Sequence, residues 1–130
     1  MRPLRNSVSE SSLMMMGVPK KFCNKTLADF DTFGKKSLKQ IKEFVQDYLD
    51  NLLDNIEENN GICLIGSNGV GKSFLSCIIL KEVYKHRYSC RRVTFSAYIT
   101  AYTESWGANI SISSLKKCRS WSRNGWKTRI

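Results

Sequence analysis

Residues 66–73 constrain this chain more than any other stretch. They read GSNGVGKS and match the pattern G-x-x-x-x-G-K-[ST] at every fixed position. A short apolar run from Ile62 to Ile65 precedes the motif and is typical of a strand that is buried on both faces. After Ser73 no glycine or proline interrupts the chain as far as Tyr84, which predicts a helix. Strand, loop and helix in this order are what a phosphate-binding loop requires.

Each residue type in the motif suits the binding of a nucleoside triphosphate. Glycines adopt positive φ and let backbone N–H groups approach phosphate oxygens with no Cβ in the way. The loop leads into a helix N-terminus, where free N–H groups and the helix dipole favour an anion. We expect Lys72 to reach the β- and γ-phosphates of ATP and the Ser73 hydroxyl to ligate Mg²⁺. The predicted nucleotide-binding residues are Gly66, Ser67, Asn68, Gly69, Val70, Gly71, Lys72, Ser73 and Phe74.

The segments around the motif predict an α/β domain. Lys35 to Glu58 carries one unbroken apolar stripe at helical spacing, so it predicts a helix. Arg91 to Phe95 reads as a second short strand, and we expect Ser96 to cap a helix from Ala97 to about Trp106. This order of elements predicts a P-loop NTPase fold, with an incomplete parallel sheet, flanking helices and right-handed crossovers.

We divide the chain into three parts. Residues 1–17 predict a flexible leader, residues 18–106 a partial ATP-binding domain and residues 107–130 a basic, disordered tail. Within the domain, residues 18–33 form an arm with Phe22, Leu27, Phe30 and Phe33 at irregular spacing. Two interpretations of this arm stay open. Its aromatic side chains either pack on the domain, which we favour, or border the adenine pocket.

The tail accounts for most of the excess positive charge. Residues 107–130 hold six lysines and arginines and no acid, which gives +6 of the formal net charge of +10. These six cations together with Trp121 and Trp126 are typical of an arm that binds single-stranded nucleic acid by stacking and charge. The alternative, which we favour, is a truncated or out-of-frame end, because apolar residues are sparse and follow no period.

Cysteine usage and hydropathy indicate a cytoplasmic protein. The five cysteines include no C-x-x-C pair, so reduced thiols fit better than a zinc site or a disulfide framework. No apolar run approaches the roughly 18 residues that a membrane span needs. We therefore expect no membrane association.

Three stretches resemble the DnaC/DnaI-like bacterial and phage helicase loaders, which are AAA+ ATPases related to the IstB-like transposition helpers. They are VPKKFCNKTLADFD, GICLIGSNGVGKSFLSCIIL and RRVTFSAYITAYTESW, within residues 18–106. The resemblance implies an AAA+ fold, binding of ATP with Mg²⁺, and help in placing a ring helicase on DNA. It also implies a replicative helicase and sister loader subunits as partners.

The chain departs from this family after the motif. A complete member continues with a Walker B strand that ends in Asp-Asp or Asp-Glu, and later with sensor and arginine-finger segments. Here the only acids after Lys72 are Glu82 and Glu104, and neither ends an apolar strand. We therefore expect about the first half of an ATPase domain, with ATP binding but no catalytic residue for hydrolysis. Two alternatives are an interaction fragment that binds helicase or loader subunits and a different P-loop enzyme, such as a small kinase.

Overall fold

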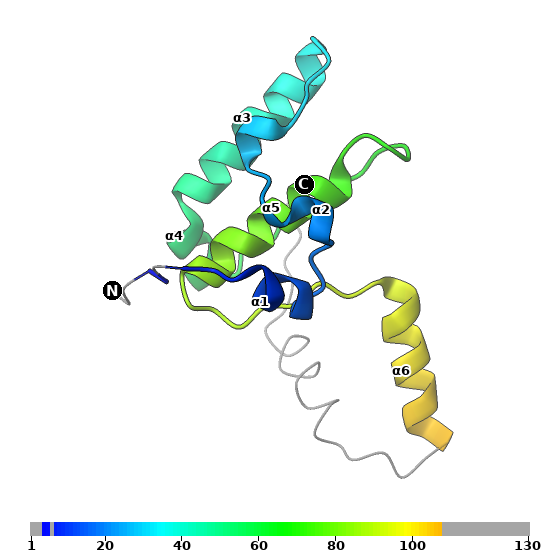
Figure 1. Ribbon diagram of the computed structural model, residues 1–130. Coiled ribbons are helices and arrows are strands. Elements are labelled where there is room, and N and C mark those ends of the chain that lie inside the picture. Colours follow the sequence, from blue (N-terminus) through cyan, green and yellow to red (C-terminus); the bar gives the residue numbers. More distant parts are fainter. Residues whose placement is uncertain (1–3, 6, 108–130) are drawn as a thin grey trace.

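The structure is a computed structural model that describes residues 4–5 and 7–107 (Figure 1). Helix α5 is central to it: α2 and α3 both pack against α5, α1 packs against α2, and α4 continues from α3. The elements are α1 (Glu10–Met15), α2 (Lys20–Cys23), the short 3-10 helix η1 (Leu27–Asp29), α3 (Lys36–Asp50), α4 (Leu52–Glu57), α5 (Lys72–Lys85) and α6 (Phe95–Gly107).

The predicted helices are confirmed, with two changes at their ends. The helix expected from Lys35 to Glu58 occurs as α3 and α4, separated at Asn51. Asn51 leaves helical geometry at φ −105° and ψ 27°, and its side-chain amide donates to the Asp47 carbonyl at 2.9 Å. The Asn51 N–H keeps its helical bond to the same carbonyl at 3.2 Å, so the side-chain bond accompanies the break without replacing that backbone bond. The expected cap at Ser96 is wrong, because α6 already begins at Phe95 and the Thr94 hydroxyl accepts from the Ala97 N–H at 3.3 Å.

The predicted parallel sheet is wrong. Residues 62–65 and 91–94 are extended, but no strand forms among the residues that the structure describes. An extended segment becomes a strand only when a neighbour pairs with its backbone, and these two segments do not pair with each other. Residues 91–94 lie instead beside the turn after α1, where the Arg92 N–H donates to the Met16 carbonyl at 2.7 Å. The apolar side chains of residues 62–65 do not lie in a sheet. Leu64 packs against the helices, and Ile65 is 90% exposed.

Two apolar clusters form the core, and α5 contributes to both. The first, which we call the N-terminal cluster, contains Leu13, Met16, Val18, Cys23 and Cys77. The second, which we call the arm cluster, contains Leu27, Phe30, Val45, Leu75 and Ile78. The two sets of α5 residues lie on different faces of the helix, so α5 is covered from two sides.

The segment expected to be a flexible leader contributes to the N-terminal cluster. Helix α1 begins after Ser9, whose hydroxyl accepts from the Ser12 N–H at 3.2 Å as an N-cap. Leu13 and Met16 are buried against α5. The helix has only six residues, too few to show a period in the sequence, so the expectation missed it.

Helix α6 extends away from the other helices (Figure 1). Its residues from Phe95 to Glu104 are all exposed, including Tyr98 and Tyr102, whose rings stack at 6.3 Å. Among the described residues, no helix is both long and apolar enough to cross a membrane.

Four cysteines lie in the described part of the chain, and they differ in exposure. Cys23 and Cys77 are buried, Cys90 is half-buried and Cys63 is exposed. Burial raises the pKa of the Cys77 and Cys90 thiols. Cys63 therefore differs from the other three in its access to solvent.

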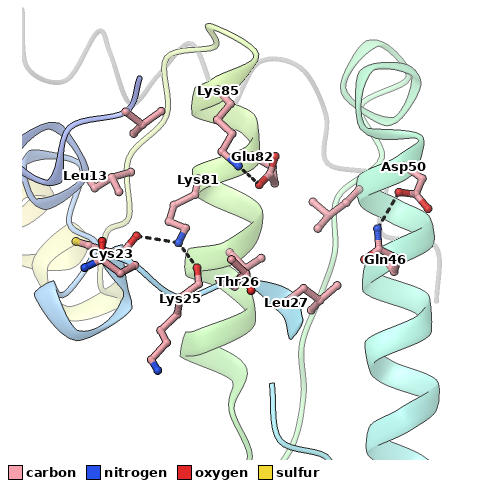
Figure 2. Close-up of a pocket in the computed structure, with 14 residues that line it drawn as sticks. Leu13, Cys23, Lys25, Thr26, Leu27, Gln46, Asp50, Lys81, Glu82 and Lys85 are labelled. Carbon is pink, nitrogen blue, oxygen red and sulfur yellow. Dashed lines mark hydrogen bonds and ion pairs between the residues drawn. The ribbon is translucent and has the colours of Figure 1, made fainter. Parts of the chain in front are cut away.

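A buried lysine joins α5 to the arm. Lys81 is 8% exposed, and its ammonium donates to the carbonyls of Phe22, Cys23 and Lys25. Figure 2 shows the bonds to Cys23 and Lys25. These carbonyls lie at the C-terminal end of α2, where helical carbonyls lack intrahelical donors. Burial, and then the charge of Lys85, lowers the pKa of Lys81. All three N–H donors of the ammonium are thus used within the protein.

The substitution Lys81→Met should lower the free energy of unfolding by about 1–3 kcal/mol, because it removes the ammonium that donates to the Cys23 and Lys25 carbonyls. Urea unfolding followed by circular dichroism measures the change. Lys85→Met is the matched control, because Lys85 lies one turn further along α5 in a partly exposed ion pair. Loss of such a pair costs at most about 1 kcal/mol. Equal stabilities of the two variants would contradict the role given to Lys81.

Candidate phosphate-binding site

The glycine-rich loop connects the exposed residue Ile65 to the first turn of α5 (Figure 1). Gly69 and Gly71 adopt the left-handed region, at φ 83° and 94°, which side chains with a Cβ rarely enter. Gly71 is also the N-cap of α5. Residues 66–70 are exposed, so the loop lies at the surface where a ligand has access to it.

Lys72 bends the loop back toward its own start. Its ammonium donates to the carbonyl of Gly66 at 2.8 Å and to that of Ser67 at 2.6 Å. Lys72 lies six positions after Gly66 and five after Ser67 in the sequence, so these bonds bring three of the predicted site residues together. An ammonium has three donors, so one remains for a phosphate oxygen without loss of the loop bonds.

The first turn of α5 supplies further N–H donors. The first intrahelical bond runs from the Leu75 N–H to the Gly71 carbonyl at 3.0 Å. The N–H groups of Lys72, Ser73 and Phe74 therefore have no intrahelical acceptor, and the helix dipole adds partial positive charge at the same place. The arrangement of an ammonium, helical N–H groups and glycines without Cβ atoms fits a phosphate group.

Phe74 differs from the other predicted residues because its side chain belongs to the core. Its ring lies 5.4 Å from the Phe22 ring and 6.0 Å from the Phe30 ring, between centroids. Only its backbone is available to a ligand. The side chains of Asn68 and Val70 are exposed on the loop.

The arm packs on the helices of the domain, as the first of the two interpretations predicted, and it also borders the loop. Leu27 and Phe30 are buried in the arm cluster, and Phe22 packs edge-on against Phe74. Phe33 does not pack on the domain in this way, because it is 74% exposed. A Cβ atom at Gly71 would lie only 2.6 Å from Cε2 of Phe30, so the ring lies directly against this glycine.

Two lysines and a capping aspartate fix the arm. Lys42 of α3 donates to the carbonyls of Ala28 at 3.1 Å and Phe30 at 3.3 Å, and Lys81 of α5 holds the earlier part of the arm. Asp29 accepts from the Thr26 N–H at 2.7 Å and from its hydroxyl at 3.0 Å. These bonds lower the pKa of the Asp29 carboxyl, so this capping interaction is complete above its ordinary pKa and weakens in acid. Sequence reasoning missed Lys42 and Lys81, since no local motif marks a lysine that binds distant carbonyls.

The acids that follow the loop in sequence do not lie at it. Glu82 is ion-paired with Lys85 at 2.5 Å on the C-terminal half of α5 (Figure 2). Glu104 is exposed on α6. The described residues include no group of three histidine, cysteine or acidic side chains that could hold a metal. Ser73, the one predicted metal ligand, is exposed on the first turn of α5 beside the loop.

A large cavity is separate from the loop. It has a volume of about 500 Å³ and lies between the arm, α3 and α5, with Leu13, Leu27, Gln46 and Lys81 in its lining (Figure 2). None of residues 66–74 lines it. A much smaller cavity of about 30 Å³ lies beside Phe30, Val70 and Lys72.

Comparison with known protein families, curated proteins and solved structures finds no match to this chain.

The substitution Gly71→Ala should destabilise the protein more than Gly34→Ala. Both glycines have positive φ, which costs a residue with a Cβ about 1–2 kcal/mol. Gly34 has no atom within 4 Å of the added Cβ, whereas Gly71 has the Phe30 ring. The difference between the two unfolding free energies isolates the contact with Phe30, for which overpacking predicts about 1–3 kcal/mol. If the two variants have nearly equal free energies of unfolding, the Phe30 ring moves away from the added Cβ freely.

Proposed function

We propose that this chain binds ATP through residues 66–74, with the phosphates over the loop and the first turn of α5. The observation that carries this proposal is the position of the Lys72 ammonium. It is bonded to the Gly66 and Ser67 carbonyls and lies at the N-terminus of α5. A cation, glycines in the left-handed region and helical N–H groups at one exposed place support an anion of high charge.

Each residue has a separate task in this proposal. Lys72 binds the β- and γ-phosphates as a charged donor, and Gly69 and Gly71 let the backbone approach them. The backbone N–H groups of Ser73 and Phe74 bind phosphate oxygens, and the Ser73 hydroxyl holds Mg²⁺. When bound, Mg²⁺ neutralises phosphate charge and bridges phosphate oxygens.

The wider role follows from the resemblance to DnaC/DnaI-like and IstB-like AAA+ ATPases. We propose a cytoplasmic protein of DNA replication that associates with a replicative helicase and with sister loader subunits when ATP is bound. Single-stranded DNA is a further proposed partner, through the basic residues 107–130, which lie outside the described residues apart from Gly107.

A non-catalytic interaction protein is the second candidate. The position of Glu82 favours it, because this acid lies nine residues beyond Ser73 on α5, about 13–14 Å along the helix, where it pairs with Lys85. In this case ATP binding controls the shape of the loop and α5, and helicase or loader subunits recognise that shape without hydrolysis.

The substitution Lys72→Ala should weaken the binding of an ATP analogue by roughly tenfold to a hundredfold. A hydrogen bond to a charged group contributes about 1.5–3 kcal/mol, and 1.4 kcal/mol corresponds to a factor of ten. A titration with a fluorescent ATP analogue in the presence of Mg²⁺ measures the affinity. Lys85→Ala is the matched control on the same helix. Equal affinities of the wild type and Lys72→Ala would falsify the proposed site.

Steady-state ATP hydrolysis should not exceed that of the Lys72→Ala variant. Phosphoryl transfer depends on groups that position the attacking water and neutralise charge, and Glu82 and Glu104 are the only acids after the loop. Phosphate release from protein that is free of host ATPases measures this rate. Release well above the variant would eliminate the non-catalytic candidate and require an acid from another subunit.

A further inference from the structure

The ring of Phe30 in the arm lies beside Gly71 of the loop. A Cβ at Gly71 would lie 2.6 Å from Cε2 of Phe30, 3.5 Å from Cδ2 and 3.6 Å from Cζ. The outer edge of the ring therefore occupies the space that any side chain at position 71 would need. Because Phe30 is 7% exposed, the surrounding side chains leave the ring little room to move away.

The position of this ring is set from outside the loop. It packs against the Phe74 ring at 6.0 Å, and the Phe30 carbonyl accepts from Lys42 of α3. Lys42 also binds the Ala28 carbonyl, so α3 holds the backbone on the N-terminal side of Phe30. A continuous set of contacts thus runs from α3 through Lys42 and Phe30 to Gly71.

Restriction of Gly71 matters for binding because glycine has the largest freedom to lose. A free glycine samples positive and negative φ about equally, and fixing one residue costs conformational entropy. A wall that already holds the backbone near φ 94° removes part of this cost before a ligand arrives. The ring can do this without touching the ligand.

We propose that Phe30 is a positioning residue for the loop, whose ring holds Gly71 in the conformation that binds phosphate. This inference rests on the proposed binding of ATP. It adds that Phe30, a residue outside the motif, raises the affinity of the loop for the phosphates. It also assigns the arm a task in phosphate binding instead of contact with adenine.

The test compares the affinities of Phe30→Leu and Phe30→Tyr with that of the wild-type chain. Leucine keeps the inner carbon atoms but lacks the outer ring edge that touches Gly71. Tyrosine keeps that edge and adds one hydroxyl, and a cavity of about 30 Å³ lies beside Phe30. Phe22→Leu is the matched control, because Phe22 packs against the same Phe74 ring. Thermal melting verifies that each variant is folded at the temperature of the titration.

Two probes separate positioning of the loop from contact with the base. One is a fluorescent ATP analogue, and the other is inorganic tripolyphosphate as its competitor, both with Mg²⁺. We expect Phe30→Leu to weaken both by about five- to thirtyfold, the effect of ordering one further residue. Phe30→Tyr should stay within about twofold of the wild type, and so should Phe22→Leu, differences of only about 0.4 kcal/mol.

Three results would overturn the inference. If Phe30→Leu weakens ATP but not tripolyphosphate, the ring contacts the base. If Phe30→Leu and Phe22→Leu have equal effects, the role is only structural. If the wild type binds neither probe, the proposed function fails and the positioning role fails with it, a result distinct from the other two.

A second pair of variants carries the test if Phe30→Leu does not fold. Lys42→Met removes the bonds to the Ala28 and Phe30 carbonyls but leaves the ring in the core. It should weaken both probes by about fivefold, the effect of one net hydrogen bond. Lys39→Met is its control, one turn earlier on α3 and exposed. Equal affinities in this pair would overturn the inference.

Discussion

The structure depends on α5 being covered from two sides at once. One face packs in the N-terminal cluster through Cys77, and another packs in the arm cluster through Leu75 and Ile78. A helix that is apolar around most of its circumference is stable only when it is buried in this way. The same helix begins at the glycine-rich loop, so the packing that stabilises α5 also fixes the direction of its N-terminal N–H groups.

The polar contacts of the arm follow from this arrangement. The arm has little regular structure, and its backbone carbonyls need donors when it lies against α5. Lys81 and Lys42 provide them from two different helices. The glycine-rich loop is thus supported by residues that lie far from it in sequence.

The local part of this structure could be predicted from the sequence, and the non-local part could not. The stripe of α3 and the uninterrupted run of α5 have a helical period, so the helices were predictable. The apolar run 62–65 was ambiguous, because such a run packs either in a sheet or against helices, and only its neighbours decide. The sheet prediction failed at this point: residues 91–94 lie beside Met16, and no second strand reaches residues 62–65 among those described.

The residues of the candidate site likewise divide into those that the sequence indicates and those that only the fold brings to the loop. The motif indicates Lys72 and Ser73 directly, because its spacing carries the chemistry. The motif also includes Phe74, whose ring belongs to the core. It omits Phe30, which lies 41 residues before Gly71 in the sequence and approaches it only in the folded chain. Residues that act through packing leave no spacing signal, so only the folded chain can reveal them.

Because the cysteines differ in exposure, a thiol reagent can label the chain selectively near the loop. Thiol reagents attack an exposed cysteine faster than a buried one, because the thiolate needs solvent and access. In the described part of the chain, Cys63 is the exposed cysteine, three residues before Gly66. With Cys118 replaced by serine, a fluorophore on Cys63 would report movement at the start of the loop, while Cys23 and Cys77 stay protected in the core.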